Sequence, residues 1–196
     1  MSSTNRGAAR RKDDAYYTPD WCVRRLMEVW NPYGDRWLEP SAGAGNIIRA
    51  AKPFTQGAHW TAVELDPEVV AWLGPLADVL LVGDFLDMAP GMARSSLPPY
   101  DVVIGNPPYS LAMEFVQACL QLGEHVALLL RLNFVGSAKR SDFLRRQMPD
   151  IYVLPNRPSF TGGKTDSIEY AWFVWGPHRS HLGRIQVLKT TPKAER

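Results

Sequence analysis

Short apolar runs rich in β-branched and aliphatic residues alternate along the chain with segments in which apolar residues recur at helical spacing. The runs are typical of strands buried on both faces of a sheet, and the helical segments are typical of the layers that cover it. We therefore predict strands at residues 36–39, 59–65, 79–83, 101–105, 125–132, 151–154 and 169–175, with 184–188 as a candidate edge strand. Helices are predicted at about residues 19–30, 46–51, 110–122 and 137–148, and one more begins at residue 67.

This alternation of strand and helix predicts an α/β fold with a mostly parallel, seven-stranded sheet and helices on both faces. A chain of 196 residues is long enough for one domain and too short for two ordinary ones. We place a single domain at residues 15–190, after a basic, disordered arm at 1–14 and before a frayed tail at 191–196.

Local signals add detail to this outline. Thr18 is the expected N-cap of the first helix, because Pro19 suits a first helical turn. Residues 88–99, MAPGMARSSLPP, predict a loop because they are rich in proline, glycine and serine. The tryptophans are expected to pack between helices and sheet: Trp21, Trp30, Trp37, Trp60, Trp72, Trp172 and Trp175.

The composition indicates a water-soluble, cytoplasmic protein. Hydrophobic residues make up 45% of the chain, and no apolar run approaches the roughly 18 residues of a membrane helix. The first residues lack the apolar core of a signal peptide. Cys22 and Cys119 lie among apolar neighbours, so we interpret them as core residues, as expected in a reducing compartment.

Positive charge is concentrated in one part of the chain, although the net charge is only +2. Between residues 131 and 164 the acidic residues are Asp142 and Asp150. The basic residues of the same segment are Arg131, Lys139, Arg140, Arg145, Arg146, Arg157 and Lys164. Such a local excess favours a surface that binds a polyanion such as nucleic acid.

Four successive predicted strands end in a polar or glycine-rich tip, and the carboxyl ends of parallel strands form the crevice where α/β proteins bind ligands. Glycines let the first of these loops turn tightly and approach a ligand closely, and an acid after the second strand is placed to bind ribose hydroxyls. Neither a Gly-Lys-Ser/Thr phosphate cradle nor the third glycine of a dinucleotide motif follows that loop. The tips carry Glu39 with Ser41, Gly43 and Gly45, then Glu64, Asp84 and Asn106.

Asn106, Pro107, Pro108 and Tyr109 end the fourth of these strands abruptly. Neither proline can donate to a sheet ladder, so the chain must leave the sheet in a stiff loop. This loop presents an amide, a free carbonyl and a phenol ring at the carboxyl end of a strand.

Taken together, the motifs resemble those of S-adenosylmethionine-dependent adenine-N6 DNA methyltransferases of the Asn-Pro-Pro-Tyr type. Tyr16-Tyr17-Thr18-Pro19 resembles the amino-terminal cofactor motif of the family, and residues 39–45, EPSAGAG, resemble its glycine loop. Phe160 resembles the aromatic residue that the family places against a flipped base. The resemblance spans about residues 16–175 and implies a Rossmann-like methyltransferase fold.

The resemblance also implies roles for individual residues. Residues implied in cofactor binding are Tyr17, Thr18, Pro19, Glu39, Ser41, Gly43, Gly45, Glu64, Leu65, Asp84, Phe85 and Asn106. Residues implied in catalysis are Asn106, Pro107, Pro108 and Tyr109. Residues implied in substrate binding are Tyr109, Phe160, Arg131, Lys139 and Arg140.

The chemistry of the loop agrees with this interpretation. The exocyclic amine of adenine is a poor nucleophile because its lone pair is delocalised into the ring. If the Asn106 side-chain oxygen and the Pro107 carbonyl accept its two hydrogens, they favour a pyramidal nitrogen and stabilise its developing positive charge. Tyr109 and Phe160 would sandwich the base, which must be flipped out or single-stranded.

Other acceptors and roles stay open at this point. RNA adenine is an alternative substrate, and glutamine-N5 methyltransferases that act on proteins also use Asn-Pro-Pro-Tyr. A non-catalytic subunit that binds nucleic acid is a further alternative. No separate target-recognition domain is predicted, so recognition is assigned to the loops at 85–100, 133–141 and 155–168 or to a partner. His178 and His181 lack further ligands, and no metal site is predicted.

Overall fold

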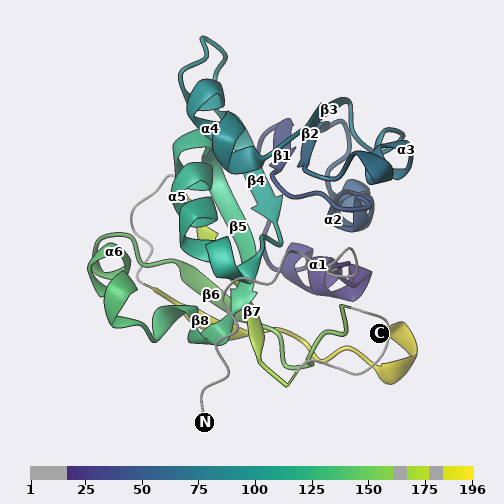
Figure 1. Ribbon diagram of the computed structural model, residues 1–196. Coiled ribbons are helices and arrows are strands. Elements are labelled where there is room, and N and C mark those ends of the chain that lie inside the picture. The colour runs from purple at the N-terminus through teal and green to yellow at the C-terminus, as the bar shows by residue number, and fades with distance from the viewer. Residues whose placement is uncertain (1–16, 161–166, 177–182) are drawn as a thin grey trace.

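A computed structural model describes residues 17–160, 167–176 and 183–196. It contains one eight-stranded sheet in the order β3-β2-β1-β4-β5-β7-β6-β8 (Figure 1). The strands are β1 (Arg36–Glu39), β2 (His59–Glu64), β3 (Val79–Val82), β4 (Tyr100–Gly105), β5 (Gly123–Arg131), β6 (Asp150–Val153), β7 (Tyr170–Trp175) and β8 (Ile185–Val187).

The predicted count of seven strands was wrong by one, because β8 adds an edge to the sheet. β8 pairs in parallel with β6, and the N–H groups of Ile151 and Leu188 donate to the carbonyls of Arg184 and Val153. Without β8 the outer edge of β6 would carry unpaired backbone groups. All strands run parallel except β7, which is antiparallel to both β5 and β6.

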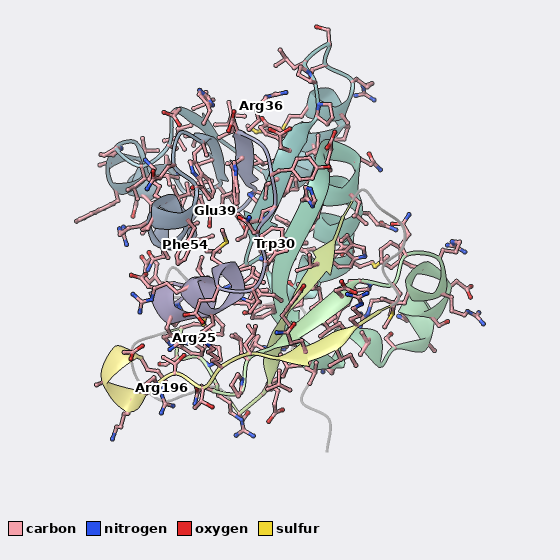
Figure 2. All side chains as sticks on the ribbon, turned by 180° about the vertical axis from the view of Figure 1, so that it is seen from behind. Arg25, Trp30, Arg36, Glu39, Phe54 and Arg196 are labelled. Atoms are coloured by element: carbon pink, nitrogen blue, oxygen red, sulfur yellow. The ribbon has the colours of Figure 1, made fainter. Side chains whose placement is uncertain are left out.

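Helices cover both faces of the sheet, as predicted. On one face lie α1 (Asp20–Met27), α2 (Asn46–Ala51) and α3 (Val70–Leu73), and on the other lie α4 (Phe85–Ala93), α5 (Ala112–Leu122) and α6 (Ser141–Arg146) (Figures 1 and 2). Successive strand residues alternate between the two core layers, as in Val102, Val103 and Ile104 of β4. The strands are therefore apolar on both sides, which explains their continuous hydrophobic runs.

Short 3₁₀ turns connect several of these elements. They are η1 (Lys52–Phe54), η2 (Pro67–Val69), η3 (Tyr109–Leu111), η4 (Leu132–Val135), η5 (Ala138–Arg140) and η6 (Lys193–Glu195). Three of them, η3, η4 and η5, follow the carboxyl ends of β4 and β5. The loops that follow these two neighbouring strands are therefore tightly folded.

Helix α4 replaces part of the loop predicted at residues 88–99. The Asp84 side chain caps α4 by accepting a hydrogen bond from the Leu86 N–H at 2.8 Å. Pro90 lies inside the helix, where a proline usually costs about 3 kcal/mol. Burial of Phe85 and Ala89 in the core layer below offsets that cost, and it is a tertiary effect that local proline and glycine content cannot reveal.

Two other local predictions were wrong. Thr18 does not cap α1, because Pro19 occupies the N-cap position. Trp72 is 70% exposed, whereas the other six tryptophans are buried. Helix α3 has only four residues, and Leu73 is its buried one, so the neighbouring indole faces outward.

The carboxyl-terminal residues pack against α1 instead of fraying. Thr191 is completely buried, and its hydroxyl accepts a hydrogen bond from Arg25 Nε at 3.0 Å. The Thr191 N–H donates to Asn156 Oδ1 at 2.6 Å. The predicted arm at 1–14, together with Tyr16, Lys164, His178 and His181, lies outside the described residues.

Cys22 and Cys119 are buried, unpaired thiols, as predicted for core residues. Within the described ranges, no helix is both long and apolar enough to cross a bilayer.

Candidate active site

The four strand-end tips meet because β3, β2, β1 and β4 are neighbours in the sheet. The Ala42 N–H donates to the Val63 carbonyl at 3.0 Å, and the Gly83 N–H donates to the Glu64 carbonyl at 2.8 Å. These bonds join the loops after β1, β2 and β3 into one continuous surface at the carboxyl edge of the sheet.

The glycine loop has the geometry that its sequence predicts. Gly43 and Gly45 both have positive φ angles, +52° and +75°, which favour glycine. A Cβ at Gly45 would meet Leu76 Cδ1 at 2.6 Å, so this glycine allows close packing. A Cβ at Gly43 would have nothing within 4 Å among the described residues, so this side of the loop is open to a ligand.

Glu64, at the end of β2, holds the glycine loop through its side chain. Glu64 Oε2 accepts a hydrogen bond from the Gly43 N–H at 2.7 Å, and Oε1 accepts from the Asp66 N–H at 2.9 Å. Each carboxylate oxygen has a second acceptor site, so Glu64 can bind hydroxyl groups while it keeps both backbone contacts. Leu65 beside it is 46% exposed.

Glu39, at the end of β1, is a buried carboxyl group. Its side chain is 1% exposed, and Oε2 has no hydrogen-bond partner among the described residues. Burial raises the pKa of Glu39 well above its usual value, and the nearby charge of Glu64 adds to this rise, whereas the Ile48 backbone N–H opposes it. The structure therefore favours the protonated form of Glu39.

Replacing Glu39 by glutamine should stabilise the protein at alkaline pH. The pKa of Glu39 is raised in the folded state, so this carboxyl contributes fully to folding stability below its unfolded pKa of about 4.3. That contribution is lost as the pH rises through the pKa of the folded state. We expect Glu39→Gln to increase the free energy of unfolding by about 1–3 kcal/mol at pH 9 and to change it little at pH 5.

Urea denaturation at both pH values measures this difference. The exposed Glu124→Gln variant controls for the loss of one negative charge. A Glu39→Gln effect that is the same at pH 5 and pH 9 would contradict the assignment of Glu39 as a carboxyl protonated by burial.

Asp84 and Phe85 do not both reach the crevice. Asp84 is exposed at the end of β3 and caps α4 with one carboxylate oxygen. Phe85 is only 3% exposed and packs on Phe115, with ring centroids 5.1 Å apart. The first turn of α4 thus directs the Phe85 ring into the core, and the implied role of Phe85 in cofactor binding stays a prediction.

The Asn106 side chain lies between two hydroxyl groups at the end of β4. Asn106 Nδ2 donates to Thr18 Oγ1 at 3.1 Å, and the Tyr109 hydroxyl donates to Asn106 Oδ1 at 2.9 Å. The Ser41 hydroxyl donates to the Asn106 backbone carbonyl at 3.3 Å. The structure thus brings together residues from the cofactor segment, the glycine loop and the catalytic loop that the sequence predicted separately.

The loop around Asn106 is firmly placed. Pro107 is buried, Pro108 is partly buried, and η3 begins immediately after them. Pro19 caps α1 next to the buried Thr18, and Tyr17 is 42% exposed. The Pro107 carbonyl and the Asn106 amide are therefore presented by a chain segment with little freedom to move.

Tyr109 belongs to an aromatic group with Phe160 and Tyr170. Its ring centroid lies 6.3 Å from Phe160 at 60° and 5.4 Å from Tyr170 at 47°. A base between two parallel rings needs a separation of about 7 Å, twice the carbon contact distance. The Tyr109 and Phe160 rings are closer and tilted, and the 4% exposed Phe160 packs edge-on against Tyr170 at 5.1 Å. The base sandwich between Tyr109 and Phe160 stays a prediction that requires one of the rings to rotate.

Burial raises the pKa of Tyr109, with a further rise from Tyr170, and so the phenol stays protonated and acts as a donor to Asn106. The Arg131 guanidinium carbon lies 4.8 Å from the centroid of the Tyr109 ring. Arg131 thus contacts the loop that follows β4. Tyr170 was not among the predicted site residues, because its place opposite Arg131 depends on the pairing of β7 with β5.

Three of the other basic residues, Arg140, Arg145 and Arg157, contact neighbouring groups. Arg140 donates from Nε to the Phe134 carbonyl at 2.7 Å, and its guanidinium lies over the Phe134 ring. Arg145 pairs with Asp142, and Arg157 pairs with Glu169. Lys139 and Arg146 are exposed on η5 and α6.

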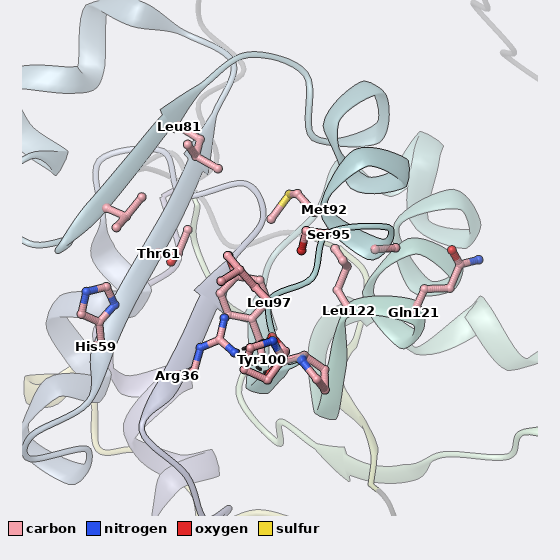
Figure 3. Close-up of a pocket in the computed structure, with 14 residues that line it drawn as sticks. Arg36, His59, Thr61, Leu81, Met92, Ser95, Leu97, Tyr100, Gln121 and Leu122 are labelled. Carbon is pink, nitrogen blue, oxygen red and sulfur yellow. Dashed lines mark hydrogen bonds between the residues drawn. The ribbon is translucent and has the colours of Figure 1, made fainter.

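A separate cavity of about 600 Å³ lies at the opposite, amino-terminal edge of the sheet (Figure 3). Its walls include the first residues of four strands, Arg36, His59, Val79 and Tyr100. Arg36 donates to the carbonyls of Pro98 and Pro99 and lies 5.2 Å from the Tyr100 ring centroid. Its guanidinium therefore holds the loop before β4, and this cavity does not include the strand-end residues described above.

The part of the chain that the structure describes contains no group of three or more His, Cys, Asp and Glu side chains able to hold a metal ion.

No protein-family model matches the chain. It is 35% identical over 99 residues to the type II methyltransferase M.TthHB8I of Thermus thermophilus, a match covering 50% of this chain and 21% of that protein. It is 26% identical over 120 residues to a Methanospirillum hungatei protein named "Probable ribosomal RNA small subunit methyltransferase A", covering 61% of this chain and 46% of the other. The chain thus spans less than half the length of either relative.

Among solved structures, the chain resembles the O-methyltransferase TomG of Streptomyces achromogenes, which was solved in complex with SAM. The TM-score is 0.54 at 16% identity, and the match covers 80% of this chain and 78% of TomG. This likeness shows that the chain has a Rossmann-like methyltransferase fold.

Proposed function

We propose that this protein transfers the methyl group of S-adenosylmethionine to N6 of adenine in DNA. The observation that carries the proposal is the Asn106 amide, held by two hydroxyl groups at the end of β4 and joined to the glycine loop through Ser41. The relatives named as methyltransferases support the reaction class. The Tyr-Thr-Pro segment, the Ser-Phe loop at Phe160 and the basic segment after β5 support adenine as the acceptor.

The residues at the strand ends fit S-adenosylmethionine as the cofactor. The open side of Gly43 accommodates a ligand that a Cβ would exclude, and Glu64 offers a carboxylate for the two ribose hydroxyls. Asp84, Leu65 and Tyr17 are exposed around the same edge. The bound cofactor supplies an electrophilic methyl group on a sulfonium centre.

The protein mainly aligns the acceptor and stabilises its developing positive charge. Asn106 Oδ1 has two acceptor sites, and the Tyr109 hydroxyl occupies one of them. The second site and the Pro107 carbonyl accept the two N6 hydrogens. Hydrogen bonds to a group that gains charge contribute about 1.5–3 kcal/mol each. The prolines keep the loop rigid, so little reorganisation accompanies the reaction.

The target base stacks on Tyr109, which adds about 1–3 kcal/mol. The Phe160 ring, now at 60° to the Tyr109 ring, must rotate to contact the other face of the base. Because the amine has to reach Asn106 below the surface, the base enters the site flipped out of a duplex or from a single strand.

RNA is the second candidate substrate, because one relative is named as a ribosomal RNA methyltransferase. Both nucleic acids present the same adenine edge to Asn106 and Pro107. A protein glutamine is a third acceptor with a planar, conjugated amide.

Incubation with tritiated S-adenosylmethionine tests the function. Duplex DNA, single-stranded DNA, RNA and protein extract are offered in parallel, and the labelled products are digested and identified. We expect label in N6-methyladenine from DNA. Label confined to RNA would transfer the proposal to the second candidate, and label confined to protein would refute a nucleic acid substrate.

Neutralising Lys139 and Arg146 should make DNA binding less dependent on salt. These two basic side chains are exposed, whereas Arg140 and Arg145 already contact other groups. Each phosphate contact contributes about 0.9 to the magnitude of the slope of log affinity against log salt concentration. The slope should therefore be smaller in magnitude by up to about 2 in the double variant Lys139→Gln, Arg146→Gln.

Fluorescence anisotropy with a labelled oligonucleotide at several salt concentrations measures this slope. The matched control is Lys52→Gln with Arg94→Gln, two exposed residues that follow α2 and α4 near the amino edge of the sheet. Equal slopes in the two double variants would place the phosphate-binding surface elsewhere.

A further inference from the structure

Thr18 lies just before α1 and has a buried hydroxyl group. Its side chain is 3% exposed, and it lies 88 residues before Asn106 in the sequence. The hydroxyl is not used to cap α1, because Pro19 takes that position and the Cys22 N–H donates to the Pro19 carbonyl. The Thr18 hydroxyl instead accepts a hydrogen bond from Asn106 Nδ2.

This contact bears directly on the orientation of the catalytic amide. With Tyr109 donating to Oδ1 and Thr18 accepting from Nδ2, the amide is held at both of its ends. The second lone pair of Oδ1 then has a defined direction. A buried amide without the Thr18 contact would have an unsatisfied N–H and could turn about its side-chain torsion toward other partners.

We propose that Thr18 is a positioning residue for Asn106, which orients the amide oxygen toward the acceptor amine. This inference rests on the proposed function of the Asn106 site. It gives a role in orienting Asn106 to a residue that the resemblance implied in cofactor binding.

The two roles predict different kinetic results. A ligand of the cofactor would mainly change cofactor affinity when its hydroxyl is removed. A positioning residue would mainly change kcat, because misplacing a reacting group by about 1 Å can cost 10²-fold in rate while the ground-state complex still forms. Ser41 reaches the Asn106 backbone carbonyl, not the amide, and so cannot replace Thr18 in this role.

The test compares Thr18→Val, which keeps the shape and removes the hydroxyl, with Thr18→Ser, which keeps the hydroxyl. We expect kcat to fall about 10–100-fold in Thr18→Val, and to stay within about threefold of wild type in Thr18→Ser. The Kd for S-adenosylhomocysteine, measured by calorimetry, should stay within about threefold in both variants. If Thr18→Val does not fold, comparing Thr18→Ala with Thr18→Ser isolates the hydroxyl in the same way.

A Thr18→Val variant with wild-type kcat would overturn the inference. So would a variant whose affinity for S-adenosylhomocysteine falls by as much as its kcat. The rate is measured with whichever acceptor the wild-type protein methylates. Failure of adenine as the substrate and failure of the Thr18 assignment therefore give separate results.

Discussion

Replacing Asn106 by alanine should abolish methyl transfer while cofactor binding persists. The variant loses the side-chain oxygen that the Tyr109 hydroxyl orients at 2.9 Å and that we assign to the acceptor amine. Removing one preorganised group that stabilises transition-state charge costs about 10²–10³-fold in kcat. Because the Pro107 carbonyl cannot hold the amine alone, we expect at least the upper end of this range.

The variant also affects stability to a limited extent. Thr18 Oγ1 loses the hydrogen bond from Asn106 Nδ2, and a buried polar group left unsatisfied costs about 1–3 kcal/mol. Cofactor affinity should nevertheless change less than threefold, since Glu64 and the glycine loop are untouched. Single-turnover kinetics and calorimetry with S-adenosylhomocysteine measure the two quantities separately.

Two variants control this experiment. Asn106→Asp keeps an acceptor oxygen at the same place and should retain part of the activity. Asn31→Ala removes an exposed asparagine and should leave the rate unchanged. Wild-type kcat in Asn106→Ala would remove Asn106 from the catalytic role.

Replacing Glu64 by alanine should weaken cofactor binding by about 10²-fold or more. The carboxylate accepts hydrogen bonds from the Gly43 and Asp66 N–H groups and is proposed to accept two more from the ribose. Hydrogen bonds to a charged group contribute about 1.5–3 kcal/mol each, so the loss of the ribose contacts alone accounts for this factor. Disturbance of the glycine loop adds to it.

Glu64→Gln separates these two contributions. The amide keeps one acceptor oxygen, but its NH₂ group then faces either the Gly43 or the Asp66 N–H, and two donors repel each other. We therefore expect affinity between those of wild type and Glu64→Ala, with kcat at saturating cofactor within a few-fold of wild type. Calorimetry that finds unchanged affinity in Glu64→Ala would exclude Glu64 from the cofactor site.

Much of the fold could be predicted from sequence because its signals are local. The runs that became β2, β4 and β5 are continuous and apolar, as strands covered on both faces must be. The eighth strand, β8, was only a candidate because its three residues are exposed and carry no such pattern. Helix α4 was missed because burial of Phe85, which lies outside the proline-rich segment, outweighs the cost of Pro90.

In the candidate site, too, the features that depend on local sequence were predictable and those that depend on tertiary packing were not. Glycine frees the backbone and proline restricts it wherever they occur. The glycine loop with Gly43 and Gly45 and the stiff loop with Pro107 and Pro108 were therefore predictable. The direction of an aromatic ring is different. Phe85 points into the core and Phe160 packs on Tyr170, because the position of lowest free energy for each ring depends on the neighbours that the fold supplies.

The sequence by itself therefore determined the order of seven strands, most of the helices and the chemistry available at each strand end. Only the tertiary structure decided which of these groups touch: Thr18 with Asn106, Gly43 with Glu64, and Arg131 with Tyr109. The physical reason is that propensities and turn residues act over a few positions, whereas these partners lie 88, 21 and 22 residues apart and meet only when the sheet aligns its strand ends.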